Sequence, residues 1–193
     1  MRLGILNEGY AFGTKLLFSL IRLFSRQPVP DAARFTFYRP DFYGSYSKKL
    51  THEAMRGPSA WSVAERELMA AYVSKMNDCR FCIGAHTATA TQASWNGDMV
   101  AASLADLESA PLQEGLRATL RIVGKLTRDG HISAEEVRAV LDTGVSREQV
   151  EDALAVCYAF NVTNRLANAF GFEVMSPEGF QAGAKYLLRR GYR

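Results

Sequence analysis

Apolar side chains recur every three or four residues along most of this chain, and no stretch shows the strict alternation that marks a β-strand. This period gathers apolar residues on one face of a helix. The pattern therefore predicts an all-α protein with roughly seven to nine helices. Helices are expected over residues 14–24, 63–76, 79–95, 112–126, 134–142, 147–170 and from 177 onward, with a short helix or loop over 103–108.

Capping residues indicate where several of these helices begin. Ser62 suits the N-cap of the helix over 63–76. The segments 133–136 (Ser-Ala-Glu-Glu) and 146–149 (Ser-Arg-Glu-Gln) have the spacing of capping boxes. Ser176 precedes a proline, which favours a final helix that starts there. Gly171 is expected to end the long helix before it.

The helices over 63–76 and 79–95 are separated by two polar residues. We expect Asp78 to cap the second helix, which would begin at Cys79. It would end near Trp95, because Asn96-Gly97 follows.

The stretch 35–46 is unusual because six of its twelve residues are aromatic. Pro40 argues against a central strand and favours an irregular segment or short helical turns. It could be a loop packed on the core, or an arm that covers a pocket or a neighbouring subunit. We predict a single domain over 1–193, with the N-terminal helix and this aromatic arm in 1–58 and the helical core in 59–193.

Composition indicates an ordinary globular chain of 193 residues, with 48% hydrophobic residues, 22% charged residues and a net charge of +3. Basic residues are not gathered into the stripe that nucleic-acid binding requires, so no nucleic-acid partner is expected. The apolar run 16–21 is too short to cross a bilayer, and no signal-peptide cleavage site follows it. We expect a cytoplasmic protein with no membrane partner.

The three cysteines are the first indication of chemistry. An odd, small number does not favour a disulfide-stapled secreted domain. Cys79 and Cys82 form a C-x-x-C pair, the spacing of a redox dithiol or of half a zinc site. Cys157 stands apart from them.

Cys79, Cys82 and His86 fall on one helical face if a helix begins near Cys79. The partial positive charge at a helix N-terminus favours a thiolate, and Arg80 could add to it. His86 could accept and return the proton. The second cysteine could then convert an oxidised thiol into a disulfide. Spacing alone leaves open which thiol attacks, because Cys79 is nearer the helix start and Cys82 is nearer His86.

Two other interpretations of the cysteines compete with this one. A structural zinc ion would need two more ligands, and neither His52 nor His131 has a ligand-pair spacing. The cysteines could also be inert core residues. Since no motif implies a metal, flavin or haem, we expect no cofactor.

A second polar stripe lies on the helix over 147–170. Cys157, Asn161, Asn164 and Asn168 follow spacings of four, three and four residues, which puts them on one face. Asparagine amides inside a helix need hydrogen-bond partners when they are buried. The stripe could be solvated or lie in an interface, or it could line the thiol pocket.

The pattern Glu67-x11-Cys79-x2-Cys82-x3-His86 resembles the alkylhydroperoxidase D-like and carboxymuconolactone decarboxylase-like superfamily, especially its peroxidase-related branch. The segments 39–42, 56–59 and 160–166 are also similar to segments of this branch. The resemblance implies an all-helical bundle that forms homo-oligomers, either trimers or hexamers. It implies that a small hydroperoxide is the substrate and that an external dithiol is the reductant.

The resemblance also implies a role for each of four catalytic residues. Cys82 would attack the peroxide, Cys79 would resolve the product, and Glu67 with His86 would relay protons. Phe81 stands where some peroxidases of the family carry a histidine. Two alternatives to the peroxidase are a decarboxylase-like enzyme that does not use the cysteines, and a non-catalytic redox sensor or oligomeric interaction protein.

Overall fold

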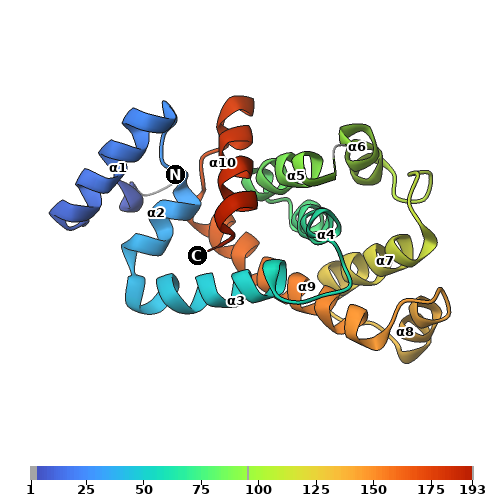
Figure 1. Cartoon of the computed structure of the whole chain (residues 1–193). Helices are drawn as coiled ribbons and strands as arrows, with labels where there is room; N and C mark the ends of the chain where they lie inside the picture. The colour runs from blue at the N-terminus through green and yellow to red at the C-terminus, as the bar shows by residue number, and fades with distance from the viewer. Residues whose placement is uncertain (1–3, 95, 193) are drawn as a thin grey trace.

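A computed structural model describes residues 4–94 and 96–192. Over these residues the chain forms ten α-helices, one 3-10 turn and one π-helical turn, with no strand, which confirms the all-α prediction (Figure 1). The elements are η1 (Ile5–Asn7), α1 (Phe12–Ser25), α2 (Asp31–Tyr38), η2 (Pro40–Gly44), α3 (Ser45–Arg56), α4 (Val63–Met76), α5 (Arg80–Ser94), α6 (Gly97–Ala105), α7 (Glu114–Asp129), α8 (Ala134–Leu141), α9 (Arg147–Phe170) and α10 (Pro177–Arg190).

Helix α4 runs through the centre of the bundle. Its residues 66–74 are buried without a break, so it is enclosed on all sides rather than on one face. Helices α5, α7 and α9 pack around it (Figure 1). Ser62 begins α4 with a capping box, in which its hydroxyl accepts from the N–H of Glu65.

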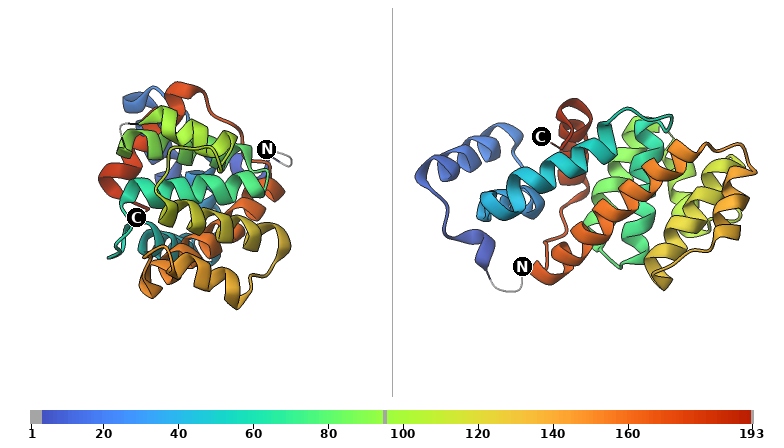
Figure 2. Two further views of the ribbon diagram at one scale, coloured as in Figure 1. Left: turned by 90° about the vertical axis from the view of Figure 1, so that its right-hand side faces the viewer. Right: turned by 90° about the horizontal axis from the view of Figure 1, so that it is seen from below.

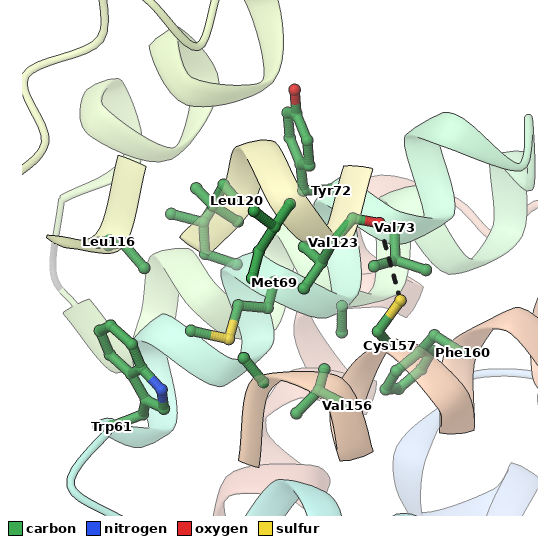
Figure 3. Close-up of a cluster of buried hydrophobic side chains, with 14 of the residues drawn as sticks. Trp61, Met69, Tyr72, Val73, Leu116, Leu120, Val123, Val156, Cys157 and Phe160 are labelled. Atoms are coloured by element: carbon green, nitrogen blue, oxygen red, sulfur yellow. Dashed lines mark hydrogen bonds between the residues drawn. The ribbon is translucent and has the colours of Figure 1, made fainter. Parts of the chain in front are cut away.

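The main core forms where α4, α7 and α9 meet. Figure 3 shows Met69 and Val73 of α4 facing Val123 of α7 and Phe160 of α9. Trp61 closes one end of this cluster, and its indole N–H donates to the carbonyl of Gln149 at 2.7 Å. The indole hydrogen bond therefore fixes the entry of α4 against the start of α9.

Most predicted caps are confirmed. The structure contains the capping boxes of Ser133 with Glu136 and of Ser146 with Gln149. Ser176 caps α10, and Gly171 ends α9 with a positive φ of 59°.

The aromatic stretch 35–46 is helical, in line with the short-turn alternative and not with a loop. It comprises the end of α2, the π-helical turn η2 and the start of α3. Pro40 fits because it occupies the first position of η2, where no N–H is needed. The Phe35 ring packs at a tilt against Tyr43, with ring centres 4.2 Å apart, and meets Phe170 edge-on at 5.0 Å, so aromatic packing holds the arm on the end of α9.

The region around residue 96 differs from the prediction. A complete helix, α6, spans Gly97–Ala105 where a short helix or loop was expected later, over 103–108. Asn96 caps this helix through a 3.0 Å bond from the Met99 N–H. Asn96-Gly97 therefore starts a helix as well as following one. The predicted helix end at Trp95 lies outside the described residues.

Helix α1 is set apart from the bundle. It contains no buried residue, and it projects from the body in Figure 1 and in the right-hand view of Figure 2. Phe18 attaches it through ring contacts with Tyr10 and Phe37. Among the described residues, no helix is long and apolar enough to cross a membrane.

Phe160 supplies the first testable prediction. It is 1% exposed, so Phe160→Ala should lower the free energy of unfolding by about 3–5 kcal/mol through lost burial and a new cavity. Urea denaturation would measure the change. Tyr158→Ala on the same helix is the matched control, because Tyr158 is 60% exposed and its loss should cost less than about 1 kcal/mol. Equal losses in the two variants would contradict this description of the core.

Candidate active site

The turn between α4 and α5 places Cys79 at a helix N-terminus. Asp78 has a positive φ of 50°, and the Cys79 N–H donates to the Ser74 carbonyl at 3.0 Å. Helix α5 then begins at Arg80, one residue later than predicted. Cys79 itself occupies the cap position, where its carbonyl accepts from the Ile83 N–H at 2.9 Å, so Asp78 belongs to the turn and does not cap the helix.

Both motif thiols are free and buried. Cys79 is 1% exposed and Cys82 is 2% exposed, in a small apolar cluster with Phe81, Ala167 and Phe180. Ala32, Phe172 and Met175 pack against this cluster. Any molecule that reaches the thiols must therefore pass aromatic and aliphatic side chains.

Glycine allows α10 to come close to α5 beside the thiols. A Cβ at Gly84 would lie only 2.5 Å from the Phe180 ring. Any larger residue at position 84 would displace Phe180 from the thiol cluster.

The two thiols have opposite electrostatic environments. The pKa of Cys79 is lowered, because its sulfur accepts hydrogen bonds from the side chain and backbone N–H of Cys82, and these outweigh the effect of burial. The pKa of Cys82 is raised well above its ordinary value, because its thiol bonds to Cys79 and because it is buried. Cys79 is therefore the first of the pair to lose a proton. Arg80 is exposed, and the pKa of Cys79 is lowered by hydrogen bonds and not by the charge of Arg80.

Asn164 is the polar group that faces the thiols. Its side chain is fully buried, its Nδ2 donates to the Ser74 hydroxyl at 3.0 Å, and its Oδ1 accepts from Asn77 at 3.1 Å. Asn164 also hydrogen-bonds both sulfurs, which lowers the pKa of each thiol. A buried amide beside the dithiol therefore favours its charged form.

The rest of the asparagine stripe supports this position. Asn161 accepts from Asn77 at 3.2 Å, and Asn168 donates to the Asn77 carbonyl at 2.9 Å. All three stripe amides thus bind the segment that precedes Cys79. The stripe is neither wholly solvated nor a free surface.

Cys157 belongs to the core. Its sulfur lies 3.7 Å from the Val123 carbonyl (Figure 3) and 3.3 Å from the Asn161 amide nitrogen. Burial raises the pKa of this thiol. Cys157 lies in the main core and not in the cluster of Cys79 and Cys82, so it is unsuited to a third redox role.

The structure brings Glu67 and His86 together. Glu67 lies on α4 and His86 lies one turn after Cys82 on α5, and these two helices pack against each other. The Nδ1 of His86 lies 2.7 Å from the Glu67 carboxylate, and both side chains are buried. The edge of the His86 ring also meets Phe160 at 4.3 Å. With Nδ1 engaged, Nε2 is the nitrogen left for proton transfer.

Two partners of Glu67 were missed by sequence reasoning. Its other oxygen accepts from Arg56 at 2.6 Å and from the Tyr192 hydroxyl at 2.9 Å. Burial opposes the charge on Glu67, but the bonds from His86 and Arg56 outweigh it, so the pKa of Glu67 is lowered. Burial and the Glu67 charge raise the pKa of Tyr192 well above its ordinary value, so this phenol stays neutral and donates.

The remaining histidines lie elsewhere. His131 is exposed, with its Nδ1 3.1 Å from the Asp129 carbonyl, and His52 accepts from the Tyr192 N–H at 3.3 Å. Within residues 4–94 and 96–192, no group of three or more His, Cys, Asp or Glu side chains is arranged to hold a metal ion.

Comparisons with known proteins agree with this geometry. Residues 41–125, which contain Glu67, the C-x-x-C pair and His86, match the model of the Carboxymuconolactone decarboxylase family. No curated protein matches the chain.

Two solved structures share the fold. An uncharacterized peroxidase-related protein from Silicibacter sp. TM1040 is 24% identical, with a TM-score of 0.77 over 92% of each chain. The alkylhydroperoxidase AhpD core of an uncharacterized peroxidase-related protein from Ralstonia eutropha JMP134 is 19% identical, with a TM-score of 0.74 over 90% of this chain and 91% of that one. These likenesses confirm the predicted alkylhydroperoxidase D-like fold.

The environment of the thiols makes a prediction about their ionisation. Asn164→Leu should raise the pKa of the first thiol to ionise and lower the thiolate fraction at neutral pH by about tenfold, since a hydrogen bond to a charged group contributes about 1.5–3 kcal/mol. Ultraviolet absorbance of the thiolate during a pH titration would measure this. Val162→Ala, on the same helix and 43% exposed, is the control and should titrate like the wild type. An unchanged titration in Asn164→Leu would contradict the role of this amide.

Proposed function

Because residues 41–125 match the Carboxymuconolactone decarboxylase family and the chain has an alkylhydroperoxidase D-like fold, we propose that it is a thiol-dependent peroxidase that reduces small hydroperoxides. One observation carries the proposal. The free, hydrogen-bonded Cys79–Cys82 pair lies at the start of helix α5, and this helix also carries His86, whose Nδ1 lies 2.7 Å from the buried carboxylate of Glu67.

The first step would be formation of a reactive thiolate. The dithiol loses one proton to His86, and Cys79 carries the charge in most of the molecules. Transfer of the remaining proton from Cys82 to Cys79 then gives the minor form, in which Cys82 is the thiolate. Cys82 is the thiol one helical turn from His86, which supports the role in attack that the resemblance implies. Glu67 holds the His86 ring in place through its contact with Nδ1.

Peroxide reduction would then follow at Cys82. The thiolate attacks one peroxide oxygen, so that an S–O bond forms and the O–O bond breaks. The departing alkoxide takes the proton that His86 had received and leaves as an alcohol. Cys82 is left as a sulfenic acid.

Cys79 would resolve this intermediate. Its sulfur attacks the Cys82 sulfur, an S–S bond forms, and the hydroxyl leaves as water with the Cys79 proton. An external dithiol then reduces the disulfide and is itself oxidised to a disulfide. The two cysteines supply both electrons, so the cycle needs no further cofactor.

Cysteine variants test the proposal. Cys82→Ser should abolish peroxide consumption with a dithiol reductant, because no thiolate is left beside His86. Cys79→Ser should still form one equivalent of sulfenic acid but should not turn over. Cys157→Ala is the matched control and should keep its activity, because Cys157 lies in the main core. Peroxide consumption can be followed by a coupled assay and sulfenic acid by trapping and mass spectrometry.

Three outcomes would change the assignment. Wild-type turnover in Cys82→Ser would overturn it. Sulfenic acid in Cys82→Ser but not in Cys79→Ser would exchange the roles of the two thiols. If both variants converted an unsaturated lactone acid while neither consumed peroxide, the decarboxylase alternative would replace the peroxidase.

A further inference from the structure

The carboxylate of Glu67 has more hydrogen-bond donors than the proposed proton relay uses. His86 needs one oxygen, yet Arg56 and Tyr192 both bind the other, at 2.6 and 2.9 Å. Arg56 lies on α3, 11 residues before Glu67, and Tyr192 follows α10, 125 residues after it. The guanidinium of Arg56 also lies 5.1 Å from the centre of the Tyr192 ring.

We propose that Tyr192, held by Arg56, is a positioning residue that fixes Glu67 so that its free oxygen faces His86. The inference rests on the proposed peroxidase function. A carboxylate with one oxygen bound by two donors cannot rotate without breaking both bonds. The Tyr192 hydroxyl also lies 3.4 Å from His86 Nδ1, so it borders the Glu67–His86 contact directly.

The Tyr192 hydroxyl also favours the ionised form of Glu67, because it donates a hydrogen bond to the carboxylate. A donor to the ionised form keeps the pKa of a carboxyl group low. Removing the hydroxyl should therefore raise the pKa of Glu67 from its lowered position. Protonated Glu67 carries no charge and is a weaker acceptor for His86, so the relay should fail at a higher pH than in the wild type.

Tyr192→Phe tests this, because it removes one oxygen and keeps the ring against Arg56. Peroxidase kcat/KM should fall by about tenfold, and the acid limb of its pH profile should move to higher pH. Tyr186→Phe is the matched control, since Tyr186 lies on α10 and is 56% exposed. A tyrosine with a packing role only would leave the acid limb in place, and that result would overturn the proposal.

A second measurement does not depend on activity. Because the folded pKa of Glu67 is lowered, the bond from Tyr192 stabilises the fold while Glu67 is ionised and weakens as pH falls and Glu67 takes up a proton. The stability lost in Tyr192→Phe should therefore be largest at neutral pH and should shrink at pH values below about 4. A pH-independent loss overturns this proposal, whereas absent wild-type peroxidase activity overturns only the proposed function.

A separate surface, on α1, supports a second proposal. Seven large apolar side chains on this 14-residue helix are exposed, from 38% for Ile21 to 82% for Phe12 and Phe24. With about 200 Å² for a whole large side chain, they expose on the order of 800 Å². The largest apolar patch of a typical monomer is about 300–600 Å², whereas one side of a stable protein interface buries about 800 Å².

The arrangement of these side chains favours a protein partner over a lipid surface. Phe12, Leu16, Leu20 and Phe24 are spaced by four residues and form the kind of ridge that packs into the groove of another helix. Only Lys15 and Arg22 are charged on α1, whereas helices that lie in membrane interfaces are rich in basic residues. Phe18 anchors the helix on its opposite side.

We infer that this face of α1 docks on a second copy of the chain. An isolated chain would leave an interface-sized apolar area in water, and association of identical chains buries it in every copy. The double variant Leu16→Glu/Leu20→Glu tests the inference. It should not affect folding, because α1 has no buried residue.

Light scattering over a range of protein concentrations would measure the mass in solution. The wild type should exceed the mass of one chain, and Leu16→Glu/Leu20→Glu should return to that mass. Lys15→Glu/Ser19→Glu, which adds the same residues on the polar face, is the control and should stay associated. A wild type that is a single chain throughout would overturn the inference, whether or not it binds vesicles of phosphatidylserine and phosphatidylcholine. An associated Leu16→Glu/Leu20→Glu variant would also overturn it.

Discussion

The buried charge of Glu67 is the constraint that organises this molecule. An ionised carboxylate inside a protein costs several kcal/mol unless charged or polar partners surround it. Glu67 lies in the middle of the most enclosed helix, and its partners Arg56, His86 and Tyr192 come from three other parts of the chain. The end of α3, the face of α5 and the segment after α10 must therefore converge on α4. The same convergence closes the bundle around the thiols.

The thiol pair, at the start of α5, depends on a different environment. Charged groups surround Glu67, whereas apolar side chains surround Cys79 and Cys82, so a thiolate there is stabilised by hydrogen bonds alone. The cap position of Cys79 and the amide of Asn164 supply those bonds. Because Cys82 and His86 are one turn apart on α5, the rigid helix fixes the distance between the apolar thiol environment and the buried charge.

Sequence reasoning recovered those parts of the site that local geometry determines. Helical spacing was enough to place Cys82 and His86 on α5 with Cys79 directly before it, and Ser62 was enough to place the start of α4. Arg56 and Tyr192 escaped it because they join Glu67 across 11 and 125 positions, where no helical period operates. The helical form of residues 35–46 was also underestimated, since it depends on ring contacts with Phe170 that local propensity does not encode.

The position before Cys82 shows how these constraints combine. Phe81 stands where a second histidine would occur in some related peroxidases, and its ring packs 5.5 Å from Phe172 and 6.0 Å from Phe180. An imidazole there would need a hydrogen-bond partner, and the rings around Phe81 provide none. Phe81 therefore completes the apolar cover of the thiols and cannot carry a proton.

If the dithiol exchanges protons with a side chain, the imidazole of His86 is the group on the same helix that can take part, and its orientation is set by Glu67. The chemistry of the sulfurs is thus tied to the buried carboxylate through a single imidazole.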